Sequence, residues 1–185
     1  MRFKYNSPII LTFALFSFSV LIADMFLSKF CTGVFALYSS QVSTSNPFTW
    51  IRLVSYVFVH AGWDHFNHNF ALILLIGPII EEKYGAGLMF LMIMVTAAAT
   101  GVLWILIGSA GLVGASGICF MLILLASFTN IRSGEIPITF ILVMLIYLVG
   151  QFFSALTPDR VSQLAHIAGG IMGAAFGFMF SKKRP

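Results

Sequence analysis

Residues 88–107 form an apolar run that contains no charged side chain. A helix rises about 1.5 Å per residue and the hydrocarbon core of a bilayer is about 30 Å thick, so a run of this length can cross a membrane. The composition agrees: 59% of the 185 residues are hydrophobic and 9% are charged, against about 25% charged in ordinary globular chains. A water-soluble domain of this size could not bury so much apolar surface. The chain is therefore expected to fold in lipid.

Similar apolar runs follow one another along the chain and predict an all-α membrane protein with a single domain over residues 1–185. Six membrane-spanning helices are expected, at residues 9–27, 65–80, 88–107, 116–130, 137–156 and 163–180. A charged turn is predicted at 81–85 and a polar loop at 157–162. The connection 28–64 is too long for a plain loop. Its amphipathic pieces predict interfacial helices in a long, partly helical first outer loop.

The charged residues indicate an orientation in the membrane rather than a nucleic-acid partner, because the net charge of +4 is scattered and forms no basic face. With the N-terminus inside, seven cations fall on inner segments and three on outer ones, as the positive-inside rule requires. The inner cations are Arg2, Lys4, Lys83, Arg132, Lys182, Lys183 and Arg184, and the outer ones are Lys29, Arg52 and Arg160. Both termini are thus predicted to be cytoplasmic. The two cysteines, Cys31 and Cys119, have neither disulfide-framework nor metal-site spacing.

Three polar side chains are predicted to lie at the same depth in the membrane. His65, Ser116 and His166 stand fifteen, fourteen and fourteen residues from the predicted inner ends of their spans, or roughly 21–23 Å at the helical rise. Polar residues inside a membrane face a bundle interior or a cavity, because exposure to lipid is costly. The three residues therefore predict one shared, water-accessible site within the outer leaflet.

A nucleophile and its base are the sharpest interpretation of this site. A serine hydroxyl is a weak nucleophile until a histidine takes its proton, so Ser116 is paired with His166. Ser116 would occupy the first turn of a helix, where unpaired N–H groups and a positive dipole favour an oxyanion. The alternative is that Gly114-Ala115-Ser116-Gly117 is only a close-packing motif. Taken alone, the motif favours that alternative.

The last span offers a way to bring His166 to Ser116. Gly169 and Gly173 follow His166 four residues apart, so they lie on one helix face. Small residues on a helix face let another backbone approach closely in a membrane. If this face packs against the helix that begins at Ser116, the histidine lies beside the serine.

The second span adds hydrogen-bond donors and raises a metal hypothesis. His65 and Asn69 lie four residues apart on one face and suit the stabilisation of an oxyanion. His60, His65 and His68, with His166, could instead hold zinc. No carboxylate or cysteine stands at a diagnostic ligand spacing, and a metal would leave Ser116 unexplained. We therefore predict neither a metal nor another cofactor.

These residues together resemble the rhomboid intramembrane serine proteases in their compact six-span prokaryotic form, from Arg52 to Gly173. The motifs that carry the resemblance are His60-x4-His65-x3-Asn69, Gly114-Ala115-Ser116-Gly117, His166-x2-Gly169-x3-Gly173 and Gly77-x3-Glu81-x3-Gly85. In the last of these the family's glutamate is structural. Arg52 resembles the arginine of the family's first-loop Trp-Arg pair, although Trp50 stands one residue early. Phe120 stands where the family often has tyrosine, and it can stack on His166 without a hydrogen bond.

The resemblance implies a serine endopeptidase that cleaves transmembrane segments of other proteins near the outer leaflet. It implies a Ser116–His166 dyad and an oxyanion hole formed by the Ser116 backbone, His65 and Asn69, with Gly114 at its entrance. Gly117 and His60 are expected to support this site. Residues 157–163 would cap it, and span 137–156 would be a route for lateral substrate entry. The partners are membrane-protein substrates and the lipid bilayer, and the expected location is a bacterial inner membrane.

Two rival functions remain at this point. A non-catalytic rhomboid-like protein would bind client helices without cutting them, although such proteins usually lack the serine or the histidine. A metal-dependent membrane enzyme or carrier is the other. The sequence leaves the substrate and the oligomeric state open.

Overall fold

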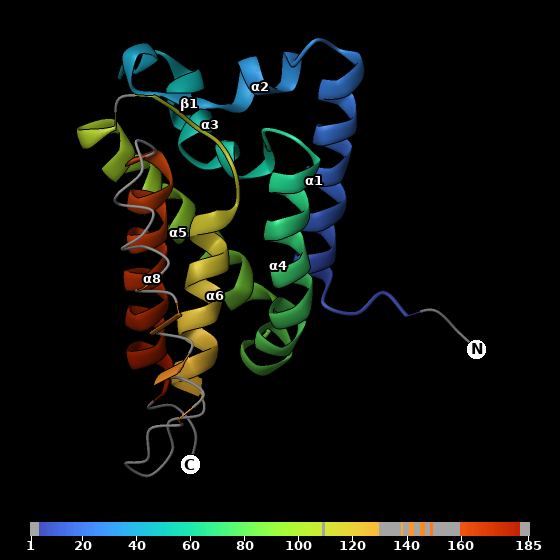
Figure 1. Ribbon diagram of the computed structural model, residues 1–185, viewed down its shortest axis with the longest axis vertical. Coiled ribbons are helices and arrows are strands. Elements are labelled where there is room, and N and C mark those ends of the chain that lie inside the picture. Colours follow the sequence, from blue (N-terminus) through green and yellow to red (C-terminus); the bar gives the residue numbers. More distant parts are fainter. Residues whose placement is uncertain are drawn as a thin grey trace.

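The computed structural model describes residues 4–108, 110–129 and 160–181, together with positions 138, 141, 142, 145, 146 and 149. Long helices run side by side and short elements cross one end of the bundle (Figure 1). The elements are α1 Pro8–Phe26, α2 Phe30–Phe35, β1 Leu37–Tyr38, η1 Ser39–Gln41, α3 Pro47–Ser55, η2 Tyr56–Phe58, α4 Trp63–Tyr84, α5 Ala86–Ile107, β2 Gly111–Leu112, α6 Ser116–Thr129 and α8 Arg160–Ser181. Most of the predicted span 137–156 and residues 157–159 lie outside the described residues.

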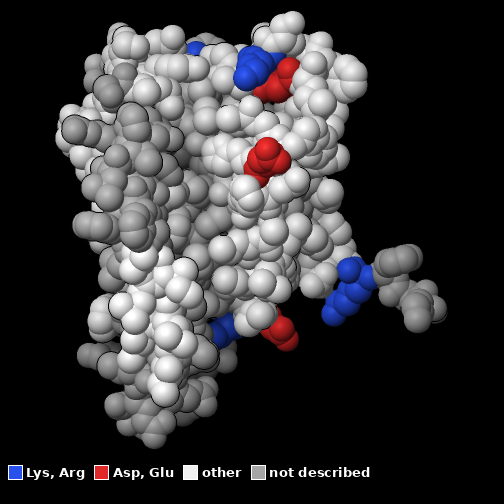
Figure 2. All heavy atoms as spheres, in the orientation of Figure 1, with Lys and Arg blue, Asp and Glu red and all other residues white. Residues whose placement is uncertain are grey.

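Three of the described helices are long and apolar enough to cross a membrane: Pro8–Phe26, Ala86–Ile107 and the part of α8 from Gln163 to Phe180. A shorter apolar helix covers Ser116–Ser127. On the face shown in Figure 2, charged atoms gather toward the two ends, and the band between them is uncoloured apart from an acidic group in its upper part. This distribution belongs to an integral membrane protein, whose apolar band faces hydrocarbon.

Two predicted boundaries are wrong. The predicted turn at 81–85 is helical through Tyr84, the last residue of α4, and the helix is capped by Gly85, whose φ is 85°. Glycine adopts this left-handed backbone without the penalty that a Cβ brings. The predicted loop at 157–162 is also too long, because α8 begins at Arg160. In both places charged residues continue a helix beyond its apolar part.

Glu81 explains why α4 extends so far. Its two carboxylate oxygens accept hydrogen bonds of 3.0 Å from the backbone N–H groups of Ile9 and Ile10. These groups lie in the first turn of α1, where N–H groups have no partner within the helix. The Ser7 side chain makes no capping hydrogen bond, so a buried carboxylate from another helix performs that task. Glu81 thus has the structural role that the resemblance implies.

Two charged side chains organise the segment between α1 and α4. Asp24 accepts hydrogen bonds from the backbone N–H of Thr32 and, at 2.6 Å, from its hydroxyl, which ties the end of α1 to the first turn of α2. Arg52 donates from Nε to the Val34 carbonyl at 2.9 Å, and its two terminal nitrogens bond Gly33 O and Gln41 Oε1. A guanidinium presents five donors in a fixed fork. One side chain therefore holds α2 and η1 against α3.

A two-residue antiparallel strand pair joins this segment to the approach to α6. Leu37 pairs with Leu112 and Tyr38 with Gly111. Just beyond it, the backbone N–H of Gly114 donates to the carbonyl of Tyr56 at 3.1 Å. The start of α6 is therefore anchored to the first loop by backbone hydrogen bonds. Nothing in the local sequence pattern predicted these strands.

Helix α6 lies among α4, α5 and α8, and its contact with α8 is the most extensive between any two described elements (Figure 1). Its buried side chains include Ile118, Met121, Leu122 and Leu125. Lipid tails are as apolar as these side chains, so close packing, rather than transfer out of water, holds such helices together. The central helix therefore depends on how closely its neighbours approach.

Candidate active site

Ser116 is the first residue of α6 and is half-buried. The backbone N–H groups of Ile118 and Cys119 both reach back to the carbonyl of Ala115, at 2.9 and 3.0 Å, and so close the first turn. The N–H groups that precede them lie at the positive end of the helix dipole, where helical partners are lacking. The hydroxyl is thus placed beside donors that favour negative charge.

Backbone contact between α6 and α8 brings His166 toward this turn. A Cβ built on Gly117 would lie 3.1 Å from the carbonyl oxygen of Ala165, the residue before His166. A Cβ on Gly169 would overlap the carbonyl of Gly117, and one on Gly173 would overlap the carbonyl of Met121. The prediction that the 169/173 glycine face allows close approach is confirmed.

The ring of Phe120 shows which face of α6 the histidine meets. The ring centroids of Phe120 and His166 are 4.2 Å apart, with the planes tilted by 48°. Ser116 and Phe120 are four residues apart and share one helix face. His166 therefore lies on the side of α6 that carries the serine. The predicted stacking between Phe120 and His166 is present.

Two side chains of α4 approach Gly114 closely, because glycine has no side chain there. Its φ is 104°, and a Cβ there would lie 2.5 Å from Cε1 and 2.6 Å from Nε2 of His65. The same Cβ would be 3.6 Å from Nδ2 of Asn69. Only glycine combines this backbone with that approach. The histidine and the amide therefore converge on one point, two residues before Ser116.

Both of these groups carry a hydrogen-bond donor on the side of Gly114. The Ala61 N–H donates to Nδ1 of His65 over 3.5 Å, so a neutral ring carries its hydrogen on Nε2, the atom nearest Gly114. Asn69 is 6% exposed, and its Nδ2 has no hydrogen-bond partner among the residues that the structure describes. Buried donors are nearly always satisfied. The Asn69 amide nitrogen is therefore suited to an acceptor that arrives with a ligand.

His60 packs against the ring of His65. It is buried, its ring centroid is 5.1 Å from that of His65, and its Nδ1 is 3.4 Å from the Phe58 carbonyl. Burial lowers the pKa of His60 to about 4, helped by the neighbouring His65 and opposed by the Phe58 carbonyl. The ring is therefore neutral at physiological pH and packs like an aromatic side chain.

The histidines do not converge as the metal hypothesis requires. His60 is buried while His68 is exposed. Within the described ranges, no group of three His, Cys, Asp or Glu side chains is placed to hold a metal ion.

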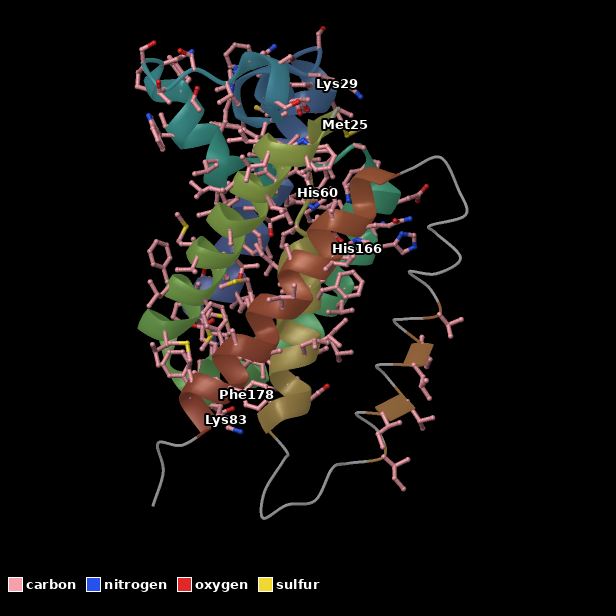
Figure 3. All side chains as sticks on the ribbon, turned by 90° about the vertical axis from the view of Figure 1, so that its left-hand side faces the viewer. Met25, Lys29, His60, Lys83, His166 and Phe178 are labelled. Carbon is pink, nitrogen blue, oxygen red and sulfur yellow. The ribbon has the colours of Figure 1, made fainter. Side chains whose placement is uncertain are left out.

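The other predicted residues lie apart from this cluster. Arg52 orders the first loop, and Glu81 caps α1. Figure 3 shows His60 and His166 toward the end of the bundle where the short elements lie, and Lys83, near Glu81 in sequence, at the opposite end. Sequence reasoning missed Cys119, whose sulfur lies 3.4 Å from the carbonyl oxygen of Asn69. Its place three residues after Ser116, in the first turn of α6, is a signal that the sequence offered.

The fold and site define a class: a helical integral membrane protein in which His65 and Asn69 converge on Gly114, just before the helix that Ser116 begins. Residues 47–183 match the family model of the rhomboid domain, and the chain belongs to the rhomboid family.

Relatives in three organisms share this similarity. The chain is 26% identical to Rhomboid protease GlpG of Haemophilus influenzae, over 72% of this chain and 71% of that protein. It is 31% identical to Rhomboid-related protein 1 of Caenorhabditis elegans, over 69% of this chain and 39% of that protein. It is 24% identical to Rhomboid-like protein 11, chloroplastic, of Arabidopsis thaliana, over 72% of this chain and 53% of that protein. The alignment thus spans about half or less of the two eukaryotic relatives.

Proposed function

We propose that this protein is an intramembrane serine endopeptidase that cleaves membrane-spanning segments of other proteins. The observation that carries the proposal is the convergence of His65 Nε2 and Asn69 Nδ2 on Gly114, two residues before Ser116. A motif that served only helix packing would not need a buried Asn69 amide nitrogen that lacks a hydrogen-bond partner among the described residues. The name of the Haemophilus relative supports a protease.

In the proposed reaction the Ser116 Oγ attacks the carbonyl carbon of the scissile peptide, while His166 takes the hydroxyl proton. The carbonyl oxygen becomes an oxyanion. The backbone N–H of Ser116 and the donors of His65 and Asn69 stabilise it, and each such donor typically contributes ~10²–10³ in rate. His166 then gives its proton to the leaving amine. A water molecule activated by the same imidazole releases the acyl group from Ser116.

The apolar helices of the bundle support a substrate that arrives through lipid. In the proposed arrangement the protein lies in a bacterial inner membrane. It has six spans, and both termini are in the cytoplasm. The site then opens toward the outer side, as the distribution of Lys and Arg favours. A peptide bond must leave its helical hydrogen bonds to reach Ser116. Segments that unwind readily in the outer leaflet are therefore the proposed substrates.

The test uses the purified protein in liposomes with a panel of fluorescent transmembrane substrates. Ser116→Ala and His166→Ala should each abolish cleavage, because each removes a group that forms or breaks a bond. Ser127→Ala on α6 and His68→Ala on α4 are matched controls and should cleave normally. A fluorophosphonate probe should label the unsubstituted protein and not Ser116→Ala. Cleavage that persists in both Ser116→Ala and His166→Ala contradicts the proposal.

The same experiment decides between a protease and a client-binding protein. A non-catalytic rhomboid-like protein would retain intact substrate helices on the unsubstituted protein and release no fragments. Chelator-sensitive cleavage would instead indicate the metal-dependent alternative.

A further inference from the structure

Cys119 contacts the proposed oxyanion donor Asn69 from the side opposite its free amide nitrogen. The thiol is buried, with 5% of the residue exposed. Its sulfur lies 3.4 Å from the backbone carbonyl oxygen of Asn69 and 3.7 Å from the side-chain oxygen Oδ1. A thiol carries one hydrogen and acts as a weak donor. Both oxygens of Asn69 on this side are acceptors, so the contact is chemically matched.

The contact with Oδ1 bears on which end of the Asn69 amide faces Gly114. A carboxamide presents an acceptor at one end and donors at the other. With Oδ1 turned toward Cys119, Nδ2 is directed toward Gly114, where it lies 3.6 Å from the position of a Cβ. Rotation of the amide by half a turn would direct an oxygen at the developing oxyanion and repel it. The orientation therefore decides whether Asn69 helps or hinders the reaction.

We propose that Cys119 is a positioning residue, which holds Asn69 through Oδ1 so that its amide donates toward Gly114. The proposal rests on the proposed function, because the orientation matters only if an oxyanion forms there. It has a second support in the structure: Asn69 Nδ2 is buried and lacks a partner in the described part of the chain. A donor left open in this way needs something else to fix its direction.

Two substitutions of Cys119 separate the effect of losing the hydrogen-bond donor from the effect of changing the side-chain volume. Cys119→Val keeps a similar apolar volume and removes the hydrogen-bond donor, whereas Cys119→Ser keeps a donor. We expect Cys119→Val to lower kcat about 3- to 10-fold, the range expected for loss of one modest hydrogen bond, with KM changed less than about twofold. Cys119→Ser should retain most of the activity. Cys31→Val and Cys31→Ser make the same changes in α2, away from the site, and should cleave normally.

A double-mutant cycle tests whether Cys119 acts through Asn69. In an Asn69→Ala background, Cys119→Val should cause no further loss of kcat, because the group that it positions is absent. A purely structural role would instead lower the melting temperature and kcat to a similar extent in both backgrounds. Normal kcat in Cys119→Val, or additive losses in the double variant, would overturn the proposal.

A measurement without substrate keeps this test separate from that of the protease function. If the unsubstituted protein cleaves nothing, the proposed function fails, and the orientation of Asn69 is then decided by its side-chain amide signals in ¹⁵N NMR. Cys119→Val should shift or broaden these signals, whereas Cys119→Ser and Cys31→Val should leave them in place. Asn69 signals that do not respond to Cys119→Val would overturn the positioning role whatever the activity.

Discussion

Gly169 of α8 lies directly against the backbone carbonyl of Gly117 in α6, so closely that no side chain fits between them. Gly169→Ala should therefore push the two helices apart and displace His166 from the first turn of α6. Overpacking of this kind typically costs about 1–3 kcal/mol. We expect a lower melting temperature and a loss of cleavage of at least tenfold.

The control for this change is Gly87→Ala in α5, where an added Cβ meets nothing within 4 Å. It should leave both melting temperature and cleavage close to normal. Equal effects of the two substitutions would show that the contact between Gly169 and Gly117 has no special importance.

Gly114→Ala tests the close approach of His65 and Asn69 to the Gly114 backbone. The substitution strains a backbone with φ of 104° and places a methyl group against the His65 ring. Since the ring must move, one oxyanion donor is displaced, and we expect cleavage to fall about 10²-fold. Gly33→Ala, at an open position of α2, is the matched control for cleavage assays in liposomes. Near-normal cleavage by Gly114→Ala would argue against an oxyanion at this position.

Glu81→Gln tests the cap that joins α4 to α1. Hydrogen bonds to a charged acceptor contribute about 1.5–3 kcal/mol, and the amide keeps only one acceptor oxygen. Unfolding in mixed micelles should therefore begin at lower denaturant, with the first turn of α1 exchanging its amide hydrogens faster. Glu82→Gln changes the adjacent, exposed carboxylate and should have little effect. Equal stability of the two variants would show that the Glu81 cap does not stabilise the protein.

The buried His60 predicts how stability depends on pH. Its pKa lies at about 4 in the folded protein, against 6.5 for the free side chain. Between these values the unfolded chain binds more protons, so stability is full above about pH 6.5 and falls as the pH is lowered toward 4. His60→Phe, which cannot be protonated, should lose less stability over this interval in detergent melts. If the stability of the two proteins depended on pH in the same way, the lowered pKa of His60 would be contradicted.

Much of the architecture could be predicted because its causes are local. Helices are present at the apolar runs 9–27, 65–80, 88–107 and 163–180, and α6 begins at the predicted residue, Ser116. The spacing of Gly169 and Gly173 predicted the close face of α8, since a helix repeats every 3.6 residues. The helix ends were less predictable, because α4 continues through Glu81 to a partner in α1.

The sequence by itself determined that this chain folds in lipid, which runs become helices and which polar residues stand out within them. These properties depend on composition and on a short helical period. Only the tertiary structure decided that Glu81 caps α1, that Tyr56 holds Gly114, and that Cys119 contacts Asn69. Each of these contacts joins residues 50 or more positions apart in the chain. They depend on which helices pack together, and no local pattern records that choice.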